Sequence, residues 1–385
     1  MSRLIGLLGL VLLVFVAFAF SNNRKKIDYG LVSKAIGAQL LLALLVLGVP
    51  ALGIEGPLQF FFVAMNDVVM AALDFTLKGS EFVFGQLVDL KKSGYIIAFR
   101  LLPTIIFFSS LMAILYYLGV MQKVVNSIAW LMQKLMNISG AESLSVAANI
   151  FVGQTEAPLL IRPFIKKMTQ SELLAVMTGG MATVAGGVLA VYVDLLHDII
   201  PNIAGHLLTA SVMSAPAALA AAKIIYPETE VPETLGSIPT GLAEVKDNNL
   251  IEAAARGAGE GLKLALNVGA MLLAFVALIA MADALLKFIG ELMYFADWGA
   301  FLVPDMILQN GGEPELSMRL ILGWIFMPIA FFMGVPAAEA GIAGSLLGQK
   351  LVLNEFFAYM ELSQVMRDLS PRTVVSLSYG LCGFA

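Results

Sequence analysis

The most prominent pattern along this chain is a series of long apolar runs separated by short polar segments. A bilayer is crossed by about 20 apolar residues in a helix. Runs of roughly that length or more cover residues 4–20, 31–54, 95–120, 171–196, 203–226 and 263–289. Polar and apolar residues alternate at helical spacing over 56–94, 121–137 and 250–262, which predicts amphipathic helices, the first two along the membrane interface. The pattern therefore predicts an all-α polytopic membrane protein.

Composition and charge support that class. Of 385 residues, 59% are hydrophobic and 13% charged, whereas soluble domains carry about 25% charged residues. The basic cluster at 24–26 follows the first apolar run, which favours a spanning helix with an outside N-terminus over a cleaved signal peptide. The single cysteine, Cys382, excludes an intrachain disulfide. Residues 227–249 form the one clearly solvated loop.

A polar stretch interrupts the apolar sequence at 149–164. Its glycine and two prolines prevent one smooth helix, and each limb, on either side of 153–156, is too short to cross a bilayer. Irregular backbone at membrane depth is tolerated only where it is buried in protein or lines a wet cavity. We therefore expect a re-entrant hairpin over about 142–168, whose buried tip carries Gln154, Thr155 and Glu156. Ser171 is expected to cap the span that follows.

The second half of the chain repeats this arrangement. Glu355 lies 199 residues after Glu156, and the same offset carries Ser171 to Ser370, where Ser370-Pro371 opens the last apolar helix. Counting spans gives the two copies opposite orientations, and inverted repeats with broken helices are typical of secondary transporters. The tip of the second hairpin remains open between 334–336 and 353–356.

The side chains at the tips limit the chemistry. Gln154 and Thr155 offer hydrogen-bond donors and acceptors, and the tips carry no Arg or Lys, which favours a neutral, heteroatom-rich solute such as a nucleobase or sugar. Asn149 and Thr183, with carbonyls near Val152 and Val184, can supply the hard oxygens that Na⁺ requires. A proton on one carboxylate is the alternative coupling ion.

These residues resemble a known family. Five motifs in the same order, at 153–158, 177–191, 211–216, 348–356 and 382–385, are similar to those of the concentrative nucleoside transporters. The resemblance covers about 95–385 and suggests a bacterial, eight-span member in the inner membrane. It implies a sodium-coupled nucleoside symporter that forms a homotrimer and works by elevator-type alternating access.

The resemblance also implies roles for individual residues. The nucleobase would contact Gln154, Thr155, Glu156 and Val188, ribose would contact Glu355, and Leu262 and Phe384 would line an apolar wall. The sodium site would comprise Asn149, Val152, Thr183 and Val184. Family members continue past Phe-Ala with an Asn and a Ser that bind ribose and a final span, so a chain ending at Ala385 is expected to be C-terminally incomplete.

A division of the chain follows from the same resemblance. Residues 1–137 are expected to form mainly scaffold spans and interfacial helices, and 138–226 the first hairpin and the following spans of a transport domain. The loop at 227–249 leads to a scaffold span at 250–290. Residues 291–385 would hold the second hairpin and the last, broken helix of the transport domain.

Three other functions are considered. A proton-coupled nucleoside symporter would use the same hairpins. An intramembrane enzyme with Glu156 and Glu355 as an acid–base pair is disfavoured because the sequence offers no nucleophile, His–Asp pair or metal cluster beside them. A passive channel would not accumulate its solute.

Overall fold

The structure, a computed structural model, describes residues 2–48, 53–154, 156–200, 202–238, 247–299 and 314–383. Within these ranges the chain is helical apart from turns and loops, and its one isolated β-bridge joins Ser139 and Leu235. Six stretches of the described chain are long and apolar enough to cross a membrane, and the bent pair α13–α14 makes up to seven. The predicted all-α membrane fold is confirmed.

The N-terminal third forms spans and amphipathic helices. The second helix begins where the Asp28 side chain accepts hydrogen bonds from the backbone N–H groups of Gly30 and Leu31, an N-cap that satisfies two otherwise unpaired donors. The helices of this part are α1 (Ser2–Ala19), α2 (Tyr29–Leu47), α3 (Gln59–Phe84), α4 (Leu90–Ser93), α5 (Ile97–Tyr117) and α6 (Val120–Met136).

The first hairpin and the spans after it follow in the middle of the chain. Two capping boxes open its helices: Ser139 with Glu142, and Thr169 with Glu172. The elements are α7 (Gly140–Asn149), the 3₁₀ turns η4 (Ala157–Ile161) and η5 (Ile165–Lys167), α8 (Gln170–Ala182), α9 (Gly186–Leu196) and α10 (Ile203–Ile225).

The last third of the chain ends, like the middle third, with short helices followed by a helix that a side chain caps. Ser370 caps its final helix by accepting from Thr373 N, with Pro371 at the first helical position, as predicted. The elements are α11 (Leu250–Leu292), α12 (Phe295–Trp298), α13 (Met318–Phe332), α14 (Ala337–Val352), α15 (Glu355–Val365) and α16 (Pro371–Gly380).

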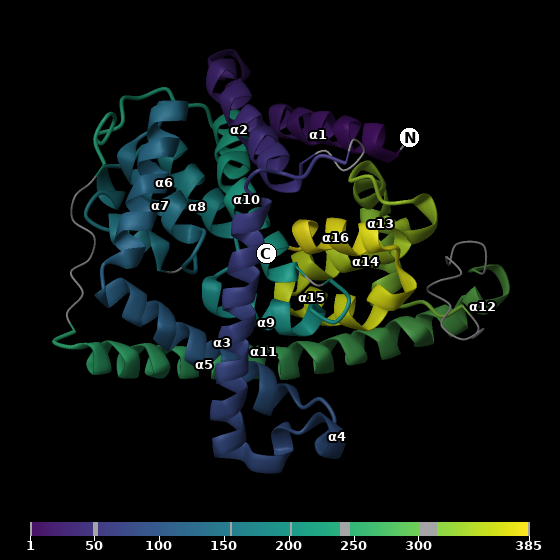
Figure 1. Cartoon of the computed structure of the whole chain (residues 1–385). Helices are drawn as coiled ribbons and strands as arrows, with labels where there is room; N and C mark the ends of the chain where they lie inside the picture. The colour runs from purple at the N-terminus through teal and green to yellow at the C-terminus, as the bar shows by residue number, and fades with distance from the viewer. Residues whose placement is uncertain are drawn as a thin grey trace.

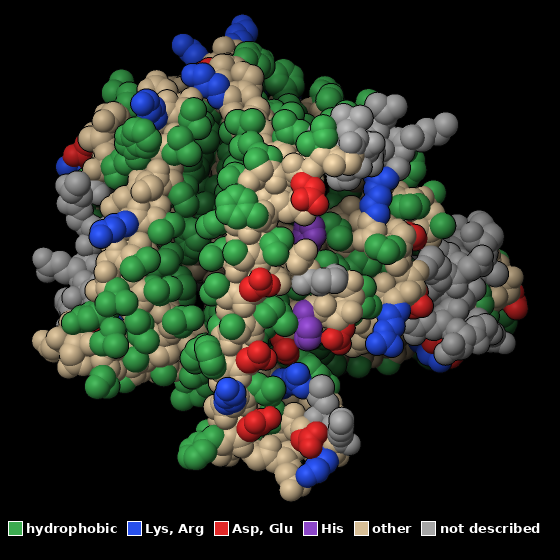
Figure 2. Space-filling model, viewed as in Figure 1, with side chains coloured by type: hydrophobic (Ala, Val, Ile, Leu, Met, Phe, Trp, Pro, Cys, Tyr) green, Lys and Arg blue, Asp and Glu red, His purple; other side chains and the backbone are tan. Residues whose placement is uncertain are grey.

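The long helix α11 joins two groups of helices. In Figure 1 it runs beneath both α6–α8 on one side and α13–α16 on the other, with α9 and α10 between them. Glycines allow α11 to approach α5 closely, since a Cβ at Gly257 would lie 2.6 Å from Ala113 Cβ and one at Gly261 only 2.8 Å from Ile106 Cα. Hydrophobic side chains cover much of the visible face (Figure 2), and Phe82 and Leu273 are 92% and 75% exposed, as expected of surfaces facing lipid.

Three expectations about local structure differ from what the structure shows. Residues 59–84 form one helix long and apolar enough to cross a membrane, where the sequence analysis expected an amphipathic segment along the interface. Thr169, and not Ser171, caps α8, because Glu172 completes a capping box with Thr169. The second limb of the first hairpin, expected as part of a broken helix, consists of the 3₁₀ turns η4 and η5.

Candidate functional site

The break at the tip of the first hairpin is joined to a break between α8 and α9. The Asn149 amide donates to Gly179 O at 2.6 Å and to Thr183 Oγ1 at 2.7 Å, and the Thr183 hydroxyl donates to Asn149 O at 2.7 Å. Thr183 and Ala185 are extended, which ends one helix and begins the next. Gly186 N then donates to Phe151 O at 2.9 Å. The two irregular segments therefore form one buried unit.

This unit has the oxygens that a small hard cation requires. Asn149 and Thr183 are 2% and 1% exposed, and the Asn149 Oδ1 atom is buried without a hydrogen-bond partner in the described part of the chain. Val152 and Val184 are also buried, and their carbonyls lie at helix breaks where i+4 donors are lost. A buried unpaired oxygen is costly unless something binds it, so the predicted sodium residues fit Na⁺.

The second acidic tip is enclosed by aromatic side chains. Asn354 caps α15, and Glu355, 4% exposed, accepts a hydrogen bond from Tyr192 OH at 3.2 Å. The Tyr192 ring stacks on Tyr359 with 4.1 Å between centroids and meets Phe356 edge-on. Glu355 therefore lies at the break between α14 and α15, and a second break at 333–336 separates α13 from α14, which are bent by 117°.

Tyr192 was missed by the sequence analysis. It lies four residues after Val188 on α9, and residues i and i+4 share one face of a helix, so the predicted contact at Val188 implied it. Both residues are buried. Together they form an apolar face with one hydroxyl that reaches Glu355.

Glu156 has different surroundings. Gln154 and Glu156 are exposed, and Arg256 and Glu260 of α11 lie near enough for their charges to act on the Glu156 carboxylate. Gln154 packs over α8, because a Cβ at Gly180 would lie 3.3 Å from Gln154 Cβ. The first tip thus lies beside α11, whereas the second lies against α9.

The remaining predicted site residues are Leu262, Thr155 and Phe384. Leu262 is on α11 and is 47% exposed. Thr155 and Phe384 lie outside the described residues.

A lysine approaches the second tip, although the tips themselves carry none. Lys350 Nζ donates to Gly380 O at 3.2 Å and Cys382 O at 3.0 Å, and its charge acts on Glu355. The sequence analysis did not identify it, because Lys350 lies in the last turn of α14 and its contacts depend on how α16 folds back.

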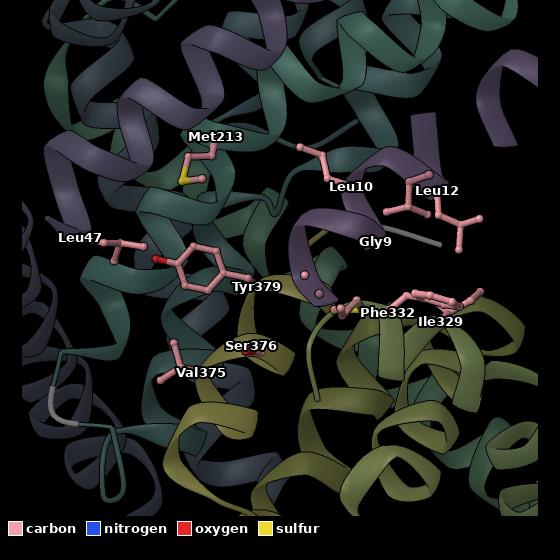
Figure 3. A pocket seen from close by; sticks show the side chains of 14 residues that line it. Gly9, Leu10, Leu12, Leu47, Met213, Ile329, Phe332, Val375, Ser376 and Tyr379 are labelled. Atoms are coloured by element: carbon pink, nitrogen blue, oxygen red, sulfur yellow. The ribbon is translucent and has the colours of Figure 1, made fainter. Parts of the chain in front are cut away.

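A separate apolar cavity of about 480 Å³ lies between α1, α10, α13 and α16. Figure 3 shows the side chains around it, among them Leu10, Met213, Phe332 and Tyr379. The Tyr379 hydroxyl is 3.2 Å from His206 Nδ1. Within the described residues, none of the predicted site residues lines this cavity, and the side chains of its walls include no amide or carboxylate of the kind that would bind a nucleoside.

Two matched sets of broken helices around buried polar groups define a secondary transporter of the polytopic membrane class. Comparison with known families agrees. The profile described as "Na+ dependent nucleoside transporter C-terminus" matches residues 206–385, "Nucleoside recognition" matches 98–198, and "Na+ dependent nucleoside transporter N-terminus" matches 8–87.

Individual relatives include a nucleoside permease and a sodium/nucleoside cotransporter. The chain is 41% identical to the nucleoside permease NupC of Helicobacter pylori, covering all of this chain and 86% of that protein. It is 39% identical to mouse sodium/nucleoside cotransporter 1, of which it spans 56%. Among solved structures, CNTnw in an inward-facing substrate-bound state is 42% identical with a TM-score of 0.85, covering all of this chain and 86% of that one. The chain belongs to the Na⁺-dependent, concentrative nucleoside transporter family, whose members are multi-pass membrane transporters and not enzymes.

Proposed function

We propose that this chain takes up nucleosides across the cell membrane as a sodium-coupled symporter. The observation that carries the proposal is the Asn149–Thr183 unit. It joins the first hairpin to the α8–α9 break, and among the described residues it leaves one buried oxygen, Asn149 Oδ1, without a hydrogen-bond partner. Binding of Na⁺ there would satisfy that oxygen and fix both breaks in one geometry.

That geometry supports the coupling of sodium to nucleoside. Gln154, Thr155 and Glu156 directly follow the sodium residues on the hairpin, and Val188 follows the α8–α9 break, so a cation that orders both segments orders both sides of the nucleobase site. Coupling of this kind requires that one ligand change the affinity for the other. Sodium should therefore raise nucleoside affinity, and nucleoside should raise sodium affinity by the same factor.

The remaining contacts are assigned to ribose and to an apolar wall. Glu355 would accept hydrogen bonds from ribose hydroxyls, with Tyr192 OH holding its carboxylate in place. Leu262 and Phe384 would line the wall. A buried carboxylate that keeps a free acceptor site is suited to a neutral polyol.

Alternating access would follow the division of the chain into a scaffold and a transport domain in a homotrimer. Residues 1–137 and 250–290 would form most of the scaffold, and 138–226 with 291–385 the transport domain, which would move as in an elevator. A buried ion pair connects the base of the first hairpin to α10, since Lys223 Nζ lies 2.9 Å from Glu142 Oε2 and also donates to Ser171 Oγ. This connection favours motion of 138–226 as one body. Solved relatives include CNTnw in an inward-facing state and a variant in an outward-facing state.

Uptake of labelled uridine into proteoliposomes tests the proposal. Sodium and proton gradients are imposed separately, with choline replacing sodium in the control. We expect accumulation above the external concentration only with the sodium gradient. Uptake driven by the proton gradient alone would replace the sodium assignment at Asn149 and Thr183 with a proton-coupled mechanism. Equilibration without accumulation would indicate a channel.

A further inference from the structure

The breaks in the two repeats correspond residue by residue. The offset of 199 residues that relates Glu156 to Glu355 also maps Thr183 onto Cys382 and Val184 onto Gly383. In the structure α8 ends at Ala182, and α16 ends at Gly380 with Leu381 as its C-cap. The segment after α16 is therefore the second-repeat counterpart of the sodium-binding break.

These two breaks lie against each other. Gly383 has φ +103°, and a Cβ there would be 2.5 Å from Met181 O at the end of α8. The Ser211 hydroxyl bridges them, since it accepts from Val184 N at 3.5 Å and lies 3.7 Å from Cys382 Sγ. Contact between equivalent breaks is expected near the axis that relates inverted repeats.

A buried amide side chain contacts the first break, and another precedes Lys350 on α14. Asn149 in the first repeat and Gln349 in the second are 2% and 6% exposed. Each donates to a hydroxyl, Asn149 to Thr183 at 2.7 Å and Gln349 to Ser345 at 3.1 Å. In the described part of the chain, the amide oxygen of each lacks a hydrogen-bond partner. Gln349, the neighbour of Lys350 on α14, is thus a buried amide with an unpaired oxygen, as Asn149 is in the first repeat.

The repeats differ in one charged side chain. Lys350 Nζ donates to the carbonyls of Gly380 and Cys382, at the end of α16 where intrahelical donors are lost. The offset places the neutral Phe151 at the matching position of the first repeat. The Lys350 charge also acts on Glu355. An ammonium group therefore binds carbonyls of the second break, as a sodium ion would bind those of the first.

We propose that the Lys350 ammonium is a tethered cation at the second-repeat counterpart of the sodium site, so that each chain couples one Na⁺ and not two. The proposal rests on the sodium-coupled function proposed above. A tethered ammonium that binds these carbonyls takes the place of a second sodium ion at this break. It also places a positive charge near the proposed ribose-binding carboxylate.

The test measures uridine binding to the purified full chain by calorimetry over a range of sodium concentrations, with choline keeping the ionic strength constant. The melting temperature with and without sodium, in the absence of nucleoside, gives a second readout. The variants are Lys350→Met, which keeps the stem without the charge, and Lys350→Arg, which keeps the charge. Lys123→Met, at an exposed position on α6, is the matched control.

We expect a sodium Hill slope of about one in the wild type, in Lys350→Arg and in the control. In Lys350→Met, uridine affinity at the same sodium concentration should fall about tenfold or more, and added sodium should partly restore it with a slope approaching two. Sodium should then raise the melting temperature of Lys350→Met more than that of the wild type, because two sites are filled on folding.

Wild-type affinity and slope in Lys350→Met would overturn the proposal. So would a wild-type slope near two, since a second ion would then enter with Lys350 in place, and this measurement does not depend on any variant folding. Uridine binding by the wild type that ignores sodium would instead refute the proposed sodium coupling itself.

Discussion

A buried ion pair at the base of the first hairpin gives a sharp stability prediction. Lys223, in the last turn of α10, places Nζ 2.9 Å from Glu142 Oε2 in the first turn of α7, and the two side chains are 5% and 1% exposed. Glu142 Oε1 accepts from Ser139 N as part of the capping box. Lys223→Met retains most of the side-chain volume but removes the charge.

The size of the expected stability loss depends on the Glu142 carboxylate, which stays buried after Lys223→Met. Glu142 Oε2 has no aligned hydrogen bond in the described part of the chain, so the charge of Lys223 is its main compensation. Removing one partner of a buried pair costs about 3–5 kcal/mol, because the other charge stays buried without compensation. In the double variant with Glu142→Gln the buried charge at residue 142 is gone and only the more exposed Glu228, 3.5 Å from Lys223 Nζ, loses its partner. The cost of the double variant should therefore be about 1–3 kcal/mol less than the sum of the single costs.

Unfolding of the detergent-solubilised protein, followed by tryptophan fluorescence during heating and in denaturant, measures these differences. Lys123→Met is the control for loss of a lysine at an exposed position and should change the free energy of unfolding by less than about 0.5 kcal/mol. If Lys223→Met were as stable as that control, or if the single costs simply added, the ion pair would not stabilise the hairpin base and the reasoning would fail.

Three predictions concern the ligand sites. Glu355→Gln should weaken uridine binding in calorimetry by about tenfold or more while leaving the melting temperature near wild type, because a charged acceptor is lost and packing is retained; wild-type affinity would refute the ribose role. Tyr192→Phe removes the hydroxyl that donates to Glu355 at 3.2 Å and should cost about 1 kcal/mol of uridine binding free energy. When Tyr192→Phe is added to Glu355→Gln, little further loss of binding is expected. Thr183→Val should raise the sodium concentration for half-maximal uridine binding about tenfold, as one oxygen ligand is lost, and an unchanged sodium dependence would exclude Thr183 as a ligand.

The sequence predicted the elements that depend on local signals. The span at 203–226 matches α10, and Ser370-Pro371 opens α16 as expected, because hydropathy and capping act within a few residues. Ser171 was a wrong N-cap prediction, since Thr169 and Glu172 form the better local pair and Ser171 instead donates to Tyr226 O. Residue types alone did not decide between these neighbouring caps.

The contacts that the sequence did not predict are long-range ones. Tyr192 and Glu355 are 163 residues apart, and Lys350 reaches backbone 30 and 32 residues away. Such contacts depend on how the two repeats pack, which no local periodicity encodes. The offset of 199 residues predicted which segments correspond, but it gave no information on which side chains meet between them.

The length of α11 determines where water reaches the first hairpin. Its 43 residues extend about 65 Å, roughly twice the thickness of the hydrocarbon layer. The charge-free stretch 264–282 is about the right length for that layer, so the turns that carry Arg256 and Glu260 project beyond it. Arg256 donates to Asp247 and thereby holds the pKa of that carboxyl below its ordinary value, as is usual for a wet ion pair. Because this projecting end lies beside Glu156, the first tip faces charged groups outside the hydrocarbon layer, whereas the carboxylate of residue 355 is enclosed.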